Sequence, residues 1–215
     1  GDIENTDAGH SGIQVNGSST LTLDNVNITT SRHAVRVEST GAVVINGGVY
    51  EVTGDGNSTQ HALNIGRKAN GSEPEIKANV TVNGGKFIGP KAVVGTIIDG
   101  APVWVQGKST LTIKGGEFSG AKGLEGIHVD PSAAEAVIVC EGGKFLDFNP
   151  ACNNAGNSFV YKDCKVKVTR VQNGSTTEED VTNSKPISGA DPTKTFAEQK
   201  YPGSITYTYI YNVVA

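Results

Sequence analysis

The chain has 215 residues, a formal net charge of −4, 28 glycines and only 6% aromatic residues. It contains no block of Lys and Arg to attract nucleic acid or an anionic membrane, and no apolar run near the ~18 residues of a membrane helix. The length favours one main domain and the composition an all-β chain, and we expect Gly1 to be a processed end or the boundary of an excised fragment.

One family of short runs recurs along the chain. Each run alternates apolar with polar residues, which predicts a strand with one buried face. The five runs are SGIQV (11–15), HAVRV (33–37), HALNI (61–65), APVWV (101–105) and EGIHV (125–129).

A second family of runs ends in Gly-Gly followed by an aromatic residue. Its members are VVINGGVY (43–50), VTVNGGKF (80–87), LTIKGGEF (111–118) and IVCEGGKF (138–145), with LTLDNVNI (21–28) as a diverged copy. We interpret the glycine pairs as turns between strands, because a positive φ or a close backbone approach would penalise a side chain there. The connection between the two runs is longer in two of the repeats, so we expect insertions at one corner.

Strands that repeat in a fixed order predict a solenoid, since a single coil cannot bury its apolar side alone. A β-sandwich also has short strands and many turns, but it has no reason to repeat them. We therefore predict an all-β fold, a right-handed single-stranded parallel β-helix of about five to six coils, each built from the same pair of strands. Two inward columns are expected: Leu23, Ile45, Val82, Ile113 and Cys140, and Ile28, Tyr50, Phe87, Phe118 and Phe145.

The repeat fades toward the C-terminus. We expect SFVYKDCKVKV (158–168) to be a partial sixth coil, so that the β-helix spans residues 1–168. Residues 169–215, which end in the alternating run ITYTYIYNVV (205–214), are predicted to form a C-terminal cap with a terminal strand.

The outward side of the first family is the most varied surface of the predicted β-helix. Its central column is expected to read Gln14, Arg36, Asn64, Trp104 and His128, with Tyr161 as an extension. An exposed Trp beside amide and charged side chains suits a sugar ring or a protein surface. The alternative is that residues 91–100 cover Trp104 and that the rest is an ordinary solvated face. His33 and His61 are expected to stack on one another as a structural ladder.

The remaining residues considered predict no binding, metal or catalytic site. The opposing strand offers a plain outward column without a site, formed by Asp24, Asn46, Asn83, Lys114 and Glu141. We read Cys140 as a buried thiol and Cys152 with Cys164 as a candidate bridge, and we expect neither a metal nor a cofactor. Six Asn-x-Ser/Thr sequons are uninformative in a chain this rich in these residues.

The GG-x-F coils with their H-A-L-x-I-type companions resemble the pectate-lyase-like superfamily, and the repeats of large surface proteins of gut-dwelling Gram-positive bacteria. The resemblance covers residues 11–168 and implies an extracellular or cell-surface location within a larger multidomain protein. Many members of the superfamily cleave acidic polysaccharides. Of the polygalacturonase motifs the chain offers only AGHSG at 8–12, and Arg36 lacks the carboxylate cluster of the lyases.

The sequence thus favours a non-catalytic, adhesin-like binding module whose partner is a glycan or host glycoprotein, with no nucleic acid and no membrane insertion. The predicted binding residues are Arg36, Asn64, Trp104, His128 and Tyr161. The first alternative is a polysaccharide lyase or glycoside hydrolase, for which Glu125, His128 and Asp130 are the candidate acid–base residues. The second is a passive surface spacer.

Overall fold

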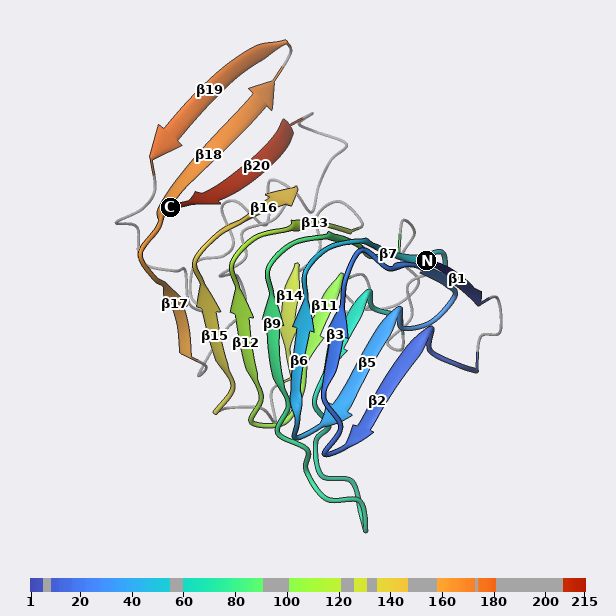
Figure 1. Cartoon of the computed structure of the whole chain (residues 1–215). Coiled ribbons are helices and arrows are strands. Elements are labelled where there is room, and N and C mark those ends of the chain that lie inside the picture. The colour runs from blue at the N-terminus through green and yellow to red at the C-terminus, as the bar shows by residue number, and fades with distance from the viewer. Residues whose placement is uncertain are drawn as a thin grey trace.

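A computed structural model of the chain describes residues 1–5, 9–54, 60–90, 101–120, 126–130, 135–146, 158–172, 174–180 and 207–215. Every regular element in these residues is a strand, and most strands run parallel to their neighbours in three sheets (Figure 1). This all-β arrangement is that of a parallel solenoid. No helix in the described part of the chain is long and apolar enough to cross a membrane.

The first family of runs forms a five-stranded parallel sheet. Its spatial order is β14 (Ile127–Val129), β11 (Val103–Val105), β8 (Leu63–Ile65), β5 (Val35–Ser39) and β2 (Ile13–Gly17). The predicted register is confirmed, because one row of paired residues runs through Gln14, Arg36, Asn64, Trp104 and His128.

A six-stranded parallel sheet lies in front of the five-stranded one in Figure 1. Its strands are β17 (Ser158–Tyr161), β15 (Val137–Cys140), β12 (Thr110–Ile113), β9 (Asn79–Val82), β6 (Ala42–Ile45) and β3 (Leu21–Leu23). The predicted inward column is confirmed and buried: Leu23, Ile45, Val82, Ile113 and Cys140.

The expectation that Tyr161 extends the column of Trp104 is wrong. Tyr161 lies in β17, where it pairs with Cys140 at the end of the six-stranded sheet. The side-chain period of two is the same in every strand, so alternation around Tyr161 could not tell one sheet from another.

The third sheet has nine strands. Six of them are parallel: β1 (Asp2–Asn5), β4 (Asn27–Thr30), β7 (Val49–Val52), β10 (Lys86–Ile88), β13 (Glu117–Ser119) and β16 (Gly143–Leu146). The repeat therefore contributes three strands rather than the predicted two, because each Gly-Gly run holds two short strands separated by a turn.

The glycine pairs form this turn, as predicted. Their second members have positive φ angles: 106° at Gly48, 107° at Gly85, 103° at Gly116 and 116° at Gly143. A Cβ atom at Gly48 would lie 2.0 Å from the carbonyl oxygen of Val26, in the strand connection alongside. Only glycine fits this corner without displacing the backbone.

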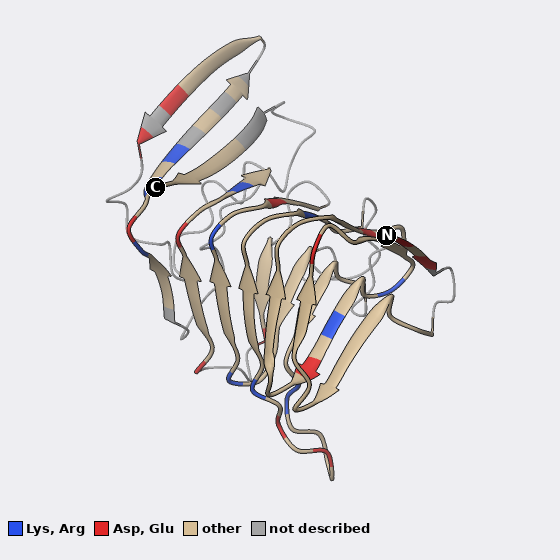
Figure 2. Cartoon of the chain, in the orientation of Figure 1, with Lys and Arg blue, Asp and Glu red and all other residues tan. Residues whose placement is uncertain are grey.

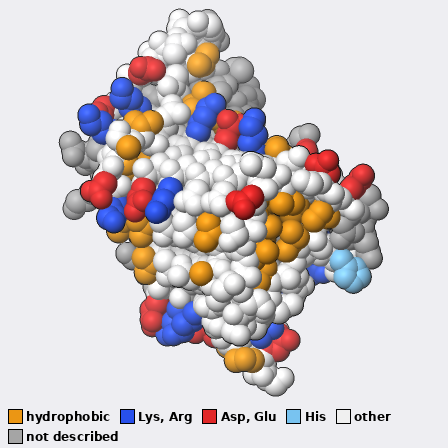
Figure 3. Space-filling view, in the orientation of Figure 1, with side chains coloured by type: hydrophobic (Ala, Val, Ile, Leu, Met, Phe, Trp, Pro, Cys, Tyr) orange, Lys and Arg blue, Asp and Glu red, His pale blue; other side chains and the backbone are white. Residues whose placement is uncertain are grey.

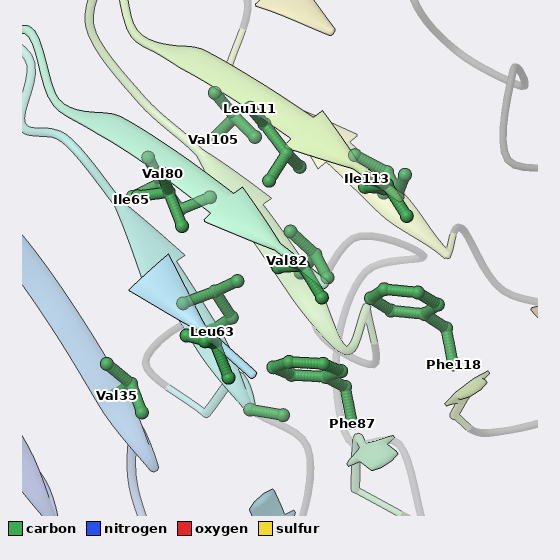
Figure 4. Close-up of a cluster of buried hydrophobic side chains, with 14 of the residues drawn as sticks. Val35, Leu63, Ile65, Val80, Val82, Phe87, Val105, Leu111, Ile113 and Phe118 are labelled. Atoms are coloured by element: carbon green, nitrogen blue, oxygen red, sulfur yellow. The ribbon is translucent and has the colours of Figure 1, made fainter. Parts of the chain in front are cut away.

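Aromatic rings stack in the core beside the nine-stranded sheet. The ring centroids lie 5.0 Å apart for Tyr50 and Phe87, 4.9 Å for Phe87 and Phe118, and 4.9 Å for Phe118 and Phe145. Figure 4 shows Phe87 and Phe118 facing the aliphatic side chains of the other two sheets. The second predicted inward column is thus confirmed, and Ile28 continues it at the N-terminal end.

Insertions occur at two corners rather than the predicted one. Residues 66–78 extend the corner between the five- and six-stranded sheets, and the bridges Arg67 to Ile76 and Asn70 to Glu73 pair the two arms of this insertion. The connection that leads from the nine-stranded sheet back to the five-stranded sheet also varies in length. It spans residues 31–34 after β4 but residues 89–102 after β10. This connection joins one repeat to the next, so the pattern within a repeat does not predict its length.

Three antiparallel strands complete the nine-stranded sheet. β20 (Tyr207–Val214) pairs with both β16 and β18 (Lys165–Gln172), and β19 (Ser175–Asp180) pairs with the outer edge of β18. β18 follows β17 directly, yet β20 occupies the position beside β16 (Figure 1). The parallel stacking in this sheet therefore stops at β16.

The aromatic stack predicts the largest loss of stability. Phe118 is fully buried between two rings, so Phe118→Ala is expected to lower the free energy of unfolding by about 4 kcal/mol. Urea unfolding followed by circular dichroism measures this loss. The matched control is Thr112→Ala on the outward side of β12, which should cost less than about 1 kcal/mol. Equal losses in the two variants would contradict the role of the stack.

Candidate functional site

The five-stranded sheet presents the predicted outward column on its outer side. Gln14 is exposed, Arg36 and Trp104 are half-buried, and Asn64 and His128 are only 2% and 7% exposed. Asn64 and His128 therefore lie neither on a solvated face, as the alternative had it, nor on the exposed surface that the predicted binding column requires. Alternation fixes the direction of a side chain but not what packs against it. Residues 91–100, the predicted cover of Trp104, lie outside the described residues.

Four rings follow one another across this sheet and form what we call the ring ladder: His33, His61, Trp104 and His128. Their successive centroid distances are 5.6 Å, 4.6 Å and 5.9 Å. His33 and His61 stack, as predicted, whereas His61 meets the indole edge-on. Trp104 is therefore held between two imidazoles, and its ring orientation is fixed by packing.

Hydrogen bonding orients His61 within the ring ladder. Its Nδ1 lies 2.7 Å from the carbonyl oxygen of Ala101, which occupies the equivalent position on the next strand connection. A carbonyl oxygen only accepts, so Nδ1 carries the proton in this contact. The bond therefore links two neighbouring repeats just before the strands β8 and β11 begin.

His33 is neutral in the folded protein. Burial lowers its pKa to about 2, and the electrostatic influence of the neighbouring His61, Arg36 and Arg32 lowers it further, in that order of effect. An imidazolium there would be desolvated beside two guanidinium groups. The His33 ring of the ring ladder is thus uncharged at neutral pH.

A charged cluster holds Arg36 at the exposed part of the column. Glu38, two residues further along β5, is 5% exposed and accepts hydrogen bonds from Arg36 and from Nη1 of Arg67 at 3.4 Å. Arg67 also lies 3.6 Å from Glu73 in the insertion. Figure 2 shows these neighbouring basic and acidic positions on β5, whereas β2 carries neither. The buried carboxylate is compensated, and Arg36 is positioned by its partner.

Sequence reasoning missed the part that the insertion plays. Arg67 belongs to residues 66–78, which the repeat alignment treats as an interruption, yet it reaches back to Glu38. Its neighbour Lys68 pairs with Asp130 at 3.2 Å across the same corner. A signal for these contacts was present in the sequence. The insertion begins with two consecutive basic residues, and the neighbouring column carries the acidic residues Glu38 and Asp130.

The candidate acid–base group is only partly described. Glu125 lies outside the described residues, while His128 and Asp130 are both buried. The carboxylate of Asp130 is engaged by Lys68. Among the described residues no cluster of three or more His, Cys, Asp or Glu side chains could hold a metal ion.

The column read as plain on the six-stranded sheet is a hydrogen-bonded ladder. Asn83 donates through Nδ2 to Asn46 at 2.7 Å, and Asn46 donates to Asp24 at 2.6 Å.

The thiols of Cys140 and Cys164 are both free, with Cys164 donating to the carbonyl oxygen of Cys140 at 3.4 Å. Cys164 therefore forms no bridge in this structure, and Cys152 lies outside the described residues.

Comparison of the chain with protein-family models, with curated proteins and with solved structures finds no match.

The low pKa of His33 predicts a pH-dependent stability. The unfolded chain takes up a proton at residue 33 below pH 6.5, whereas the folded chain does so only near pH 2, so His33 lowers stability as the pH falls through this window. Between pH 7.5 and pH 5 its contribution to the free energy of unfolding should fall by about 2 kcal/mol. Urea unfolding of His33→Gln at both pH values should show a pH dependence reduced by that amount. The control Gln14→Ala replaces an exposed side chain that does not titrate and should keep the wild-type dependence; equal behaviour of the two variants would refute the assignment.

Proposed function

We propose that the chain is a non-catalytic extracellular binding module, adhesin-like in character, that recognises a glycan or a host glycoprotein. The recognition face is the outer side of the five-stranded sheet. The observation that carries the proposal is the half-buried Trp104, fixed between His61 and His128 in the same column as Arg36. Tyr161, which belongs to the other sheet, has no part in it.

The face offers two kinds of contact that a sugar needs. The indole of Trp104 supplies an apolar ring surface for the C–H groups of a pyranose. Gln106, two residues after Trp104, donates to the buried Asn64 at 3.4 Å, and Gln14, three strands away on β2, donates to Asn16 at 3.0 Å. The amides of Gln106 and Gln14 are accessible, and each both donates and accepts, which suits sugar hydroxyls.

Arg36 adds a charged contact at low entropic cost. Glu38 already holds the guanidinium, while the Arg36 side chain keeps 27% of its surface exposed. A side chain that is ordered before binding loses little freedom when a ligand arrives. Arg36 can therefore donate to a hydroxyl or a carboxylate of the partner without leaving its own ion pair.

The surrounding architecture is part of the same proposal. We take the solenoid to be a right-handed parallel β-helix of about five to six coils over residues 1–168, with residues 169–215 as its cap, akin to the pectate-lyase-like superfamily. The parallel pairing of β17 with β15 supports a coil up to Tyr161, whereas the antiparallel strand β18 crosses the proposed boundary at residue 168 and pairs with the cap strands β19 and β20. A place in a larger bacterial surface protein is consistent with it.

Glycan and mucin arrays test the proposal. Wild-type protein should bind at least one glycan class, and Trp104→Ala or Arg36→Ala should weaken binding by about tenfold or more. The matched control is Thr112→Ala, which alters the outward side of the six-stranded sheet and should bind like wild type. Circular dichroism melting checks that each variant remains folded.

Three other outcomes would overturn it. Equal loss in Thr112→Ala would place recognition elsewhere. Release of unsaturated or reducing ends from an acidic polysaccharide, abolished in His128→Ala, would establish the enzyme alternative. Absence of both binding and release across the arrays would leave the passive spacer.

A further inference from the structure

Two thiols lie close together at the corner that follows β17. Cys140 is the last residue of β15 and is completely buried in the core, and the half-buried Cys164 packs against the same core. The Cys164 thiol donates to the carbonyl oxygen of Cys140 at 3.4 Å, and the N–H of Lys162 donates to the same oxygen at 3.0 Å. Cys164 is therefore in direct contact with the residue that carries the other thiol.

The register of the strands places the Cys164 side chain beside that of Cys140. Tyr161 pairs with Cys140, so Cys164 holds the corner position that Gly143 holds one coil earlier. A Cβ atom at Gly143 would lie 3.4 Å from Cγ2 of Ile113, the residue that pairs with Cys140 on the other side. The same step along the stack sets the Cβ atom of Cys164 against the Cys140 side chain.

The corner after β17 can carry a side chain where the earlier corners cannot. Gly143 has a φ angle of 116°, at which a side chain would be strained. In the corner after β17 Asp163 takes the positive φ instead, at 51°. The corner after β3 makes the same exchange, since Asn25 has a φ angle of 52° and Val26 packs against the core. The core-facing side chain at this position is thus a thiol in one corner and an aliphatic group in the other.

The two thiols differ in access. The outside of the corner is polar, because Lys162 lies 3.6 Å from Glu141 and 4.0 Å from Asp163. Figure 3 shows basic and acidic side chains on the left of the molecule, where Figure 1 places β15 and β17. Cys164 is the thiol that a dissolved reagent reaches first, since Cys140 is completely buried. Burial raises the pKa of both thiols, so their thiolates form mainly above neutral pH.

We propose that Cys140 and Cys164 form a reversible disulfide that fastens this corner to the preceding coil. The oxidant is a small-molecule disulfide such as oxidised glutathione. The Cys164 thiolate attacks one sulfur of that disulfide, which breaks its S–S bond, forms a mixed disulfide and releases one thiol. The Cys140 thiolate then attacks the Cys164 sulfur and releases the second thiol. Two protein thiols are oxidised, and one small disulfide gains their two electrons and two protons.

The bridge would fix the position of the terminal strand. β16 starts shortly after Cys140 and β18 directly after Cys164, and β20 pairs with both strands. Val213 near the end of β20 is buried and pairs with Gly143 on one side and Val166 on the other. A bond between the two cysteines therefore holds the two strands that flank β20 at a fixed spacing.

Tryptic mapping of the full chain tests the pairing, because trypsin places the three cysteines in separate peptides. Cys140 lies in residues 123–144, Cys152 in 145–162 and Cys164 in 163–165. Reduced folded protein incubated with oxidised glutathione at about pH 8.5 should give peptide 163–165 linked to peptide 123–144. Any other link between cysteine peptides, or no link at all, would overturn the proposal.

Cysteine variants test the order of the two steps. In Cys140→Ala, glutathione should remain attached to Cys164, because no second thiolate displaces it. In Cys164→Ala, glutathione should attach to Cys140 about tenfold more slowly or less, because that thiol is buried. Equal rates of attachment in the two variants would contradict the proposed order.

Thermal melting and hydrogen exchange test the effect of the bridge. Oxidation should raise the melting temperature of the wild-type protein by about 5 °C and slow exchange at Val213 by about tenfold. Both changes should be reversed by dithiothreitol and retained in the matched control Cys152→Ser. The proposal fails if the reduced and oxidised proteins melt alike or if Cys152→Ser loses the effect. Glycan binding enters none of these readouts.

Discussion

Stacking of like side chains between parallel strands is the interaction on which the rest of this molecule depends. Tyr50, Phe87, Phe118 and Phe145 lie at near-contact ring distances because three parallel pairings hold their strands in the same register. A slip of one residue would turn each ring outward. The corner glycines make this register possible, since a side chain at Gly48 would collide with the backbone alongside. The aromatic stack and the glycine corner therefore depend on each other in every repeat.

The same register creates the candidate binding face. Residues at one position of successive repeats must lie beside one another, whether they are similar, as His33 and His61 are, or different, as Arg36 and Asn64 are. The inward positions are constrained to be apolar, and the outward ones are free to vary. Chemical diversity can therefore concentrate in one column without disturbing the core. The insertion at residues 66–78 then adds contacts, through Arg67, that the strands alone do not provide.

The repeat made the strand columns predictable from the sequence, including both inward columns and the row from Gln14 to His128. Three features were not predictable because they do not repeat. β20 pairs with β16 across a long stretch of chain, the burial of Asn64 and His128 depends on packing outside their own strand, and Tyr161 belongs to a strand where the pattern has faded. The third strand was hidden for another reason, since the corner glycines lie inside a run that reads as continuous.

Distances between spin labels along one outward column test the parallel stacking most directly. Thr22, Val139 and Val160 occupy the same outward position on β3, β15 and β17, and the pairings place Val139 four strands and Val160 five strands from Thr22. With strands about 4.8 Å apart, the label pairs Thr22 with Val139 and Thr22 with Val160 should give separations near ~19 Å and ~24 Å. Separations that fail to grow in strand order, or that match two strands on opposite sheets of a sandwich, would contradict the solenoid.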